Sequence, residues 1–260
     1  MSEKLDQQDT LLSGVTRAFS ILDVLASHEH LNLETLSKET ELPKPTALRF
    51  LTTLINLGYV YRNPEDQYSV TLKLFSLGSR ALDHLDLYQI IRPFAKQLSE
   101  TLGETVHVGI RDEDEALYIL KIESKYTIRM YSRVGKRIPL YCTAIGKSLL
   151  LGSTEEAIVQ YAKRTKLVPF TQYTITKPKD LVREVTQIAD SGIAQDNQEH
   201  EIGIRCIGSP IIDYTGKPVA ALSTSWPLFR FDESQFNYYC DTIQQTAQQI
   251  SRLLGKPSYM

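Results

Sequence analysis

Apolar residues near the start of the chain recur every three or four positions in three short runs. These runs, at 13–26, 33–40 and 45–57, predict three amphipathic helices. Asn32 suits the start of the second helix because its side chain can cap free N–H groups, and Pro45 suits the start of the third because it has no N–H group to leave unpaired. The apolar residues expected to form the core-facing sides of these helices are Val15, Ala18, Phe19, Leu22, Leu25, Ala26, Leu33, Leu36, Leu48, Leu51, Leu54, Ile55 and Leu57.

Two runs of strand-forming residues follow the third helix. Residues 59–62 and 67–70 flank the turn formers Asn63–Asp66, which predicts a β-hairpin. Two helices joined by a tight turn and followed by a hairpin are typical of a winged helix-turn-helix, which we expect at 13–71 after a polar arm at 1–12. The same pattern also occurs in helical pairs that bind no DNA and in modules that bind another protein.

The remainder of the chain predicts a linker helix and a larger domain. The apolar stripe of 72–85 has too few neighbours to form a core, so we expect it to pack on the same helix of a second copy, or alternatively within its own chain. Residues 86–260 group strands and helices without regular alternation, which predicts an α+β fold with an antiparallel sheet. The expected strands are 105–110, 116–122, 127–134, 204–212 and 218–226, and the expected helices are 88–102, 143–151, 155–163, 179–191 and 232–254.

The composition is that of an ordinary globular protein with room for two domains. Of 260 residues, 42% are hydrophobic and 23% charged. No apolar run is long enough to span a bilayer and the polar start is unlike a signal peptide, so a cytoplasmic protein without membrane contact is expected. The three cysteines lack paired spacing, which indicates reduced thiols and neither a disulfide framework nor a zinc site. A net charge of −2 argues against polybasic nucleic-acid binding over the whole surface.

The third helix is nevertheless locally cationic. Between Pro43 and Arg62 the only charged residues are Lys44, Arg49 and Arg62, so a phosphate backbone would meet a positive face. If this helix enters the major groove, its first turns reach the base edges, and Arg49 is the best candidate for a bidentate contact with guanine. Arg17 can touch a phosphate from the first helix or simply be solvated. The DNA-binding candidates are Arg17, Lys44, Pro45, Thr46, Ala47, Arg49 and Arg62.

Two groups of residues in the larger domain suggest a ligand site. The start of the helix at Thr143 offers free N–H groups next to several cations, which suits a carboxylate, although it can equally be a packed helix start. Ser223 and Ser225 point to the same face of one strand and need polar partners, which a ligand could supply. The polar run Asp196–Glu201 could support that ligand or, alternatively, bind a metal.

An enzyme is a further alternative. It would use Cys142 or Cys206 as a nucleophile with His107 or His200 as the base. No nucleophile elbow or glycine-rich phosphate loop accompanies these residues, so we expect no catalytic residue, metal or cofactor.

Several motifs together resemble the IclR family of bacterial transcription regulators. They are Leu42–Leu51, Leu57–Val60, Pro139–Lys147, and the set Asp196, Glu199, His200, Gly203, Arg205 and Cys206. The runs Tyr68–Phe75, Ile128–Arg133 and Arg205–Ile207 are similar to the branch that represses pectin and hexuronate breakdown genes and responds to 2-keto-3-deoxygluconate.

The resemblance implies a winged helix, a linker helix and a GAF-like effector domain. It also implies a homodimer or dimer of dimers on a pseudo-palindromic operator, and a small organic acid as effector. The N–H groups of Ala144 and Ile145 would hold the effector carboxylate, while Asp196 and the serines would bind hydroxyl or keto groups. Many members have Ser where this chain has Pro45, so Thr46 or Lys44 must supply that phosphate contact. The effector-binding residues implied are Ile128, Met130, Ala144, Ile145, Asp196, Cys206, Ser223 and Ser225.

Overall fold

The computed structural model describes residues 13–74, 76–77, 86–127 and 131–256. The chain divides into two units, Met1–Leu85 and Asp86–Met260, each with its own hydrophobic core. None of the described helices is both long and apolar enough to traverse a lipid bilayer.

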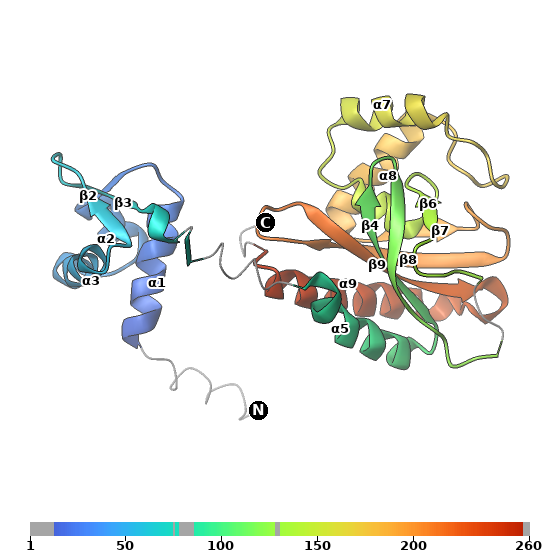
Figure 1. The fold of residues 1–260 in the computed structure, drawn as a ribbon, viewed down its shortest axis with the longest axis horizontal. Helices are drawn as coiled ribbons and strands as arrows, with labels where there is room; N and C mark the ends of the chain where they lie inside the picture. Colours follow the sequence, from blue (N-terminus) through green and yellow to red (C-terminus); the bar gives the residue numbers. More distant parts are fainter. Residues whose placement is uncertain (1–12, 75, 78–85, 128–130, 257–260) are drawn as a thin grey trace. The chain divides into compact units, whose positions relative to one another are not determined.

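The first unit combines the helices α1, α2 and α3 with a small antiparallel sheet (Figure 1). Its strands lie in the order β1-β3-β2, so that the hairpin β2–β3 forms a wing beside the helices. The elements are α1 (Ser13–Ala26), β1 (Leu31–Asn32), α2 (Leu33–Glu39), α3 (Lys44–Asn56), β2 (Val60–Arg62) and β3 (Gln67–Val70).

Local sequence explains these elements. The side chain of Asn32 accepts a 2.9 Å hydrogen bond from the N–H of Thr35 and so caps α2. Pro45 lies in the first turn of α3, where a backbone N–H would have no intrahelical acceptor, so its missing N–H costs no hydrogen bond. In the wing turn, the Asn63 side chain accepts a 2.8 Å hydrogen bond from the N–H of Gln67. These contacts fix where α2 and the hairpin begin.

The apolar faces of α1 and α3 differ from the prediction at five positions. Val15 and Phe19 of α1 are 53% and 61% exposed. Ala26 of α1 is also exposed, as are Leu48 and Leu57 at α3. On α3 the buried seam is Ala47, Leu51 and Leu54, so Leu51 and Leu54 lie in the core as predicted and Ala47 takes the place expected for Leu48. On α1, Ile21 joins the buried Leu22 and Leu25. Periodicity alone does not say which neighbouring stripe meets the core.

The second unit is built on one six-stranded antiparallel sheet. Its strands follow the order β6-β5-β4-β9-β8-β7, with hairpins joining β4 to β5 and β8 to β9. The elements are α5 (Leu87–Leu102), β4 (Thr105–Asp112), β5 (Glu115–Ile122), β6 (Arg137–Pro139), α6 (Ala144–Leu149), α7 (Glu155–Thr165), α8 (Pro178–Ser191), β7 (Ala194–Asn197), β8 (Ile204–Ile212), β9 (Pro218–Pro227) and α9 (Phe236–Leu253).

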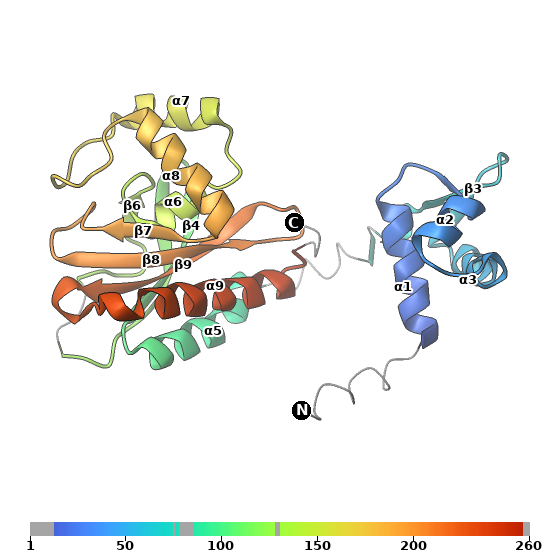
Figure 2. The ribbon, with the colours of Figure 1, turned by 180° about the vertical axis from the view of Figure 1, so that it is seen from behind.

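Helices cover both faces of this sheet. Figures 1 and 2 show α5 and α9 side by side on one face, and α6, α7 and α8 on the other. Successive side chains of a strand point to opposite faces, so Val106 and Val108 of β4 join the core under α5 and α9, whereas His107 points toward α6. The antiparallel α+β fold expected from the sequence is therefore present.

Three elements of this unit differ from the prediction. The strand predicted at 127–134 is wrong for residues 131–134, which form no strand; the pairing partner of β5 is instead β6. Asp232 caps a short 3-10 turn at Glu233–Gln235, so α9 begins only at Phe236. A further strand, β7, was not predicted and overlaps the start of the polar run Asp196–Glu201.

Some predictions lie wholly or partly outside the described residues. The arm at 1–12 and residues 128–130 are among them. Of the linker helix predicted at 72–85, residues 72–74 and 76–77 are helical, and the others are not described.

Candidate functional site

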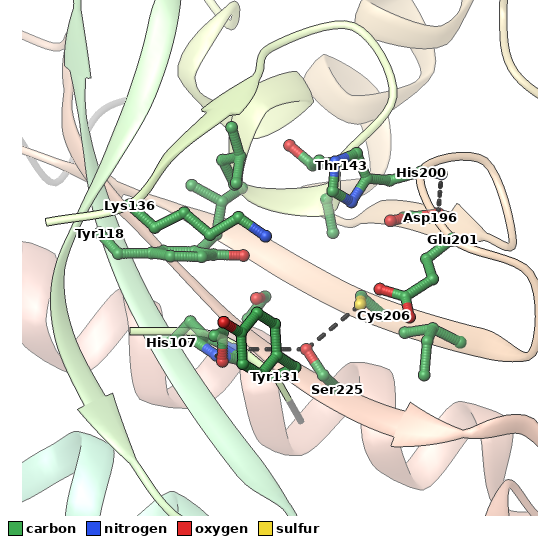
Figure 3. Close-up of a pocket in the computed structure, with 16 residues that line it drawn as sticks. His107, Tyr118, Tyr131, Lys136, Thr143, Asp196, His200, Glu201, Cys206 and Ser225 are labelled. Atoms are coloured by element: carbon green, nitrogen blue, oxygen red, sulfur yellow. Dashed lines mark hydrogen bonds between the residues drawn. The ribbon is translucent and has the colours of Figure 1, made fainter. Parts of the chain in front are cut away.

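A polar pocket lies between the sheet and α6 in the second unit (Figure 3). Its volume is about 190 Å³, which leaves room for a small metabolite. The described residues lining it come from all six strands of the sheet, from α6 and from the loops between them: His107, Tyr118, Tyr131, Ser132, Lys136, Ile138, Thr143, Ala144, Ile145, Asp196, His200, Glu201, Ile204, Cys206, Ser223 and Ser225.

Strand register assembles the floor of the pocket. His107 of β4 is paired with Ser223 of β9, and Ser225 of β9 is paired with Cys206 of β8. Cys206 is in turn paired with Asp196 of β7. Paired residues in neighbouring strands project to the same face, so these five side chains all point toward α6.

His107 is held as a neutral ring on this floor. Its Nε2 lies 2.7 Å from the Ser132 hydroxyl, its Nδ1 lies 3.4 Å from the Ser225 hydroxyl, and its ring stacks on Tyr118 at 4.7 Å. Burial, with the nearby charges of Lys121 and Lys136, lowers the pKa of His107 to about 3. At neutral pH the ring therefore has one N–H donor and one nitrogen acceptor.

Asp196 is the buried carboxyl group of the pocket. It accepts hydrogen bonds from the backbone N–H groups of Glu199 (2.8 Å) and His200 (3.4 Å), which hold the loop that follows β7. Burial, assisted by the charge of Glu199, raises the pKa of Asp196 to about 7. Near neutral pH this group can either accept a hydrogen bond from a ligand or, once protonated, donate one.

Behind Asp196 lies a buried ion-pair cluster centred on Lys147 of α6. The fully buried Lys147 Nζ lies 2.7 Å from Glu199 Oε1 and 2.8 Å from Glu184 Oε1. Burial alone would lower the pKa of Lys147, but the two carboxylates reverse this effect and raise it, so the lysine is charged. The cluster ties α6, α8 and the loop after β7 together.

The start of α6 packs tightly against the preceding strand. Thr143 donates a 2.7 Å hydrogen bond to the carbonyl of Pro139 and accepts a 3.1 Å bond from the N–H of Gly146. A Cβ at Gly146 would lie 2.3 Å from the Cα of Leu140, so only glycine fits there. Ala144 and Ile145 are the first two residues of the helix, whose N–H groups precede the first intrahelical hydrogen bond.

Six of the eight effector-binding candidates line this one pocket. They are Ala144, Ile145, Asp196, Cys206, Ser223 and Ser225. The other two, Ile128 and Met130, lie outside the described residues.

The cysteines considered as nucleophiles lie in environments that favour the neutral thiol. Burial raises the pKa of both Cys142 and Cys206, and the Cys206 thiol donates a 3.2 Å hydrogen bond to Ser225. Cys142 is fully buried and is not among the described lining residues. Within the described ranges, no cluster of three or more His, Cys, Asp or Glu side chains is arranged to hold a metal ion.

Sequence reasoning missed Tyr118, Ser132 and Ile204, and it considered His107 only as a possible catalytic base. Because side chains alternate along β4, His107 points to the other face of the sheet from Val106 and Val108. This pattern could have indicated a polar site on that face. That β4 pairs with β9 was not visible, because the two strands are separated by more than half of the domain.

The DNA-binding candidates are spread over α1, α3 and the wing. Lys44, Pro45 and Arg49 are exposed on the first turns of α3, Thr46 is half-buried, and Arg17 is exposed on α1. Arg62 pairs with Asp66 at 2.7 Å, and Lys44 lies 3.8 Å from Glu34. Ala47 is fully buried in the core, so its methyl group does not face a groove, and we leave it out of the proposed DNA surface.

Comparisons with known proteins match both units to one family. Residues 14–64 match the IclR helix-turn-helix domain, and residues 79–252 match the bacterial transcriptional regulator IclR C-terminal domain. The HTH-type transcriptional regulator KdgR of Escherichia coli K12 is 40% identical over 98% of this chain and 97% of its own length. KdgR of Dickeya chrysanthemi is 38% identical over 98% of this chain and 84% of its own. The crystal structure of Thermotoga maritima IclR has a TM-score of 0.62 at 35% identity, covering 93% of this chain and 98% of that one.

Proposed function

Because the chain belongs to the IclR family of bacterial transcriptional regulators, which are not enzymes, we propose that it is a repressor controlled by a small organic acid. The observation that carries this proposal is the pocket, which gathers backbone N–H groups, hydroxyls and a carboxyl group around about 190 Å³. Such a site binds a small polar molecule by orienting several hydrogen bonds at once.

The winged unit is proposed to read operator DNA with α3 in the major groove. Exposed Lys44 and Arg49 and half-buried Thr46 then face the DNA from its first turns, while Arg17 and Arg62 contact phosphates from α1 and the wing. In the described part of the chain, no ion pair involves the Arg49 guanidinium, so it is available for guanine.

The proposed effector is 2-keto-3-deoxygluconate or a related sugar acid. The similarity to two KdgR regulators and to the hexuronate branch supports this choice. In the proposed pose the N–H groups of Ala144 and Ile145 bind the carboxylate, and Asp196, Ser223 and Ser225 bind the keto and hydroxyl groups. The alternative is another carboxylate, whose catabolic genes this regulator would then control.

We further propose a cytoplasmic homodimer, or dimer of dimers, bound to a pseudo-palindromic operator. The dimer would have one arrangement that fits the operator and another that does not. The effector causes release of the operator only if its affinity for the second arrangement is higher than its affinity for the first. The free energy that couples the two binding events can therefore be measured either as the effect of effector on operator affinity or as the effect of operator DNA on effector affinity.

The first test titrates the full chain on DNA from its own upstream region, with and without 2-keto-3-deoxygluconate, at two salt concentrations. The expected result is specific binding that weakens with salt and is released by the sugar acid. Specific binding that no sugar acid affects would contradict the effector, and binding of equal strength to all sequences would contradict the repressor.

Two variants separate the functions of the two units. Arg49→Ala is expected to weaken operator binding by roughly 1–3 kcal/mol and to leave effector binding intact. Asp196→Ala is expected to retain operator binding and to lose the response to effector. Loss of DNA binding in a folded Asp196→Ala dimer would contradict this division.

A further inference from the structure

The pocket contains a cation that the effector assignments above do not use. Lys136 lies in the loop before β6, is half-buried, and lines the pocket. Figure 3 shows its side chain running alongside the ring of Tyr118 with the ammonium nitrogen directed into the pocket. No described residue forms an ion pair or hydrogen bond with this nitrogen. An unpaired ammonium that faces a pocket is a binding group for an anion.

The two histidines of the pocket do not share this role. Burial lowers the pKa of His107 to about 3, and it also lowers the pKa of His200. The charge of Lys136 contributes in both cases, which means that the lysine acts on both rings. Lys136 is therefore the one positively charged side chain among the described lining residues at neutral pH.

The acidic groups lie on the other side of the pocket. In Figure 3, Asp196 and Glu201 are drawn opposite Lys136, beside Cys206. Lys147 and the backbone N–H groups of Glu199 and His200 act on Asp196, and Lys136 is not among the causes that shift its pKa. The pocket is thus polarised, with a cation at one side and carboxyl groups at the other.

We propose that Lys136 is a specificity-determining residue that forms an ion pair with the carboxylate of the effector and thereby selects monoacids with an uncharged hydroxylated tail. This inference rests on the proposed function, since it concerns the effector of the same pocket. The tail of such an acid points toward Asp196 and Glu201, which accept hydrogen bonds from its hydroxyl groups. A diacid of the same length places its second carboxylate beside these two groups and is repelled.

The test is a cycle of calorimetric titrations on the full chain with two proteins and two ligands. The proteins are the wild type and Lys136→Gln, and the ligands are 2-keto-3-deoxygluconate and its uncharged methyl ester. Removing either the lysine or the ligand charge is expected to weaken binding by about ten- to a hundredfold, the usual range for one charged hydrogen bond. Removing both is expected to cost no more than removing one, because the two groups interact with each other.

Two controls exclude a general effect of charge or folding. Arg133→Gln removes an exposed cation three residues earlier, outside the described pocket lining, and is expected to bind the acid like the wild type. Lys136→Arg retains the charge and is expected to recover part of the affinity. Galactarate, a six-carbon diacid, is expected to bind the wild type at least tenfold more weakly than the monoacid.

The outcomes separate this inference from the proposed function. If Lys136→Gln binds the monoacid as tightly as the wild type, or if the two removals are simply additive, the role of Lys136 is wrong and the effector pocket stands. If galactarate binds as tightly as the monoacid, the selection for an uncharged tail is wrong. If the wild type binds neither sugar acids nor smaller carboxylates, both proposals are wrong.

Discussion

The two faces of the six-stranded sheet are filled in different ways. Under α5 and α9 the core is a continuous cluster of hydrophobic side chains, among them Ile91, Leu222 and Ile250. It includes Trp226, whose ring meets Phe231 edge to face and Tyr239 at a tilt. On the face of α6 a second hydrophobic cluster, which includes Ile145 and Leu149, lies beside a polar part of the sheet formed by His107, Asp196 and two serines, with the Lys147 cluster buried behind them. Both faces belong to the same strands, and only the alternate residues differ.

This difference teaches how one sheet can supply both stability and a binding site. Apolar packing stabilises through area removed from water and tolerates small changes. Buried charges stabilise only while every partner is present, but they hold polar groups where a ligand can reach them. We therefore expect the same size of substitution to have unequal consequences on the two faces.

The largest effect is expected for Lys147→Met. It leaves the Glu199 carboxylate buried without its partner, which typically costs about 3–5 kcal/mol of unfolding free energy. The single tryptophan, Trp226, lies in the second unit, so its fluorescence in a urea titration reports this loss. Glu184→Gln, which alters the more exposed partner, is the matched control and is expected to cost less. A Lys147→Met protein as stable as the wild type would remove the contrast between the faces.

The next effect is a pH dependence of the unfolding free energy, which arises from Asp196 on the same face of the sheet. Its pKa is about 7 in the folded chain and 3.8 in the reference state, so the folded form binds the proton more tightly. The contribution of Asp196 to stability is therefore full below about pH 4 and is lost as the pH rises through 7, by up to about 1.4 kcal/mol per pH unit. Asp196→Asn is expected to flatten this slope in urea midpoints measured from pH 5 to 8, whereas Asp190→Asn, at an exposed site, leaves it unchanged. A slope that persists in Asp196→Asn would assign it to another group.

The smallest effect compares one methyl group on each face. Ile91→Val and Ile145→Val each remove one buried methyl group. Each is expected to lower the free energy of unfolding by about 0.5–1.5 kcal/mol. Only Ile145 lines the pocket, so only its variant is expected to change effector affinity in a calorimetric titration. Equal changes in affinity would mean that the two faces are not functionally separate.

The sequence predicts the elements of this protein better than their relative positions. Helical spacing located α1 and α3, yet it assigned Leu48 to the core of α3 when Ala47 occupies that position. The polar run at Asp196 gave no sign of β7, because an edge strand with a buried carboxyl lacks the alternating apolar residues of a typical strand. The pairing of His107 with Ser223 depends on strand order, which local patterns do not encode. The resemblance to the family supplied six of the sixteen described lining residues, whereas Tyr118 and Ser132 required coordinates.

The hydrogen bond between His107 and Ser225 joins residues 118 positions apart, nearly the ends of the sheet-forming sequence. A pocket closed by such a bond cannot be moved between regulators by exchanging a loop, since each loop contributes only a fraction of the wall. A chimera designed to give another repressor this effector response must carry Asp86–Met260 as one piece. The unit of transplantation is the whole sheet with its helices, and the helix that reads DNA can then be chosen independently.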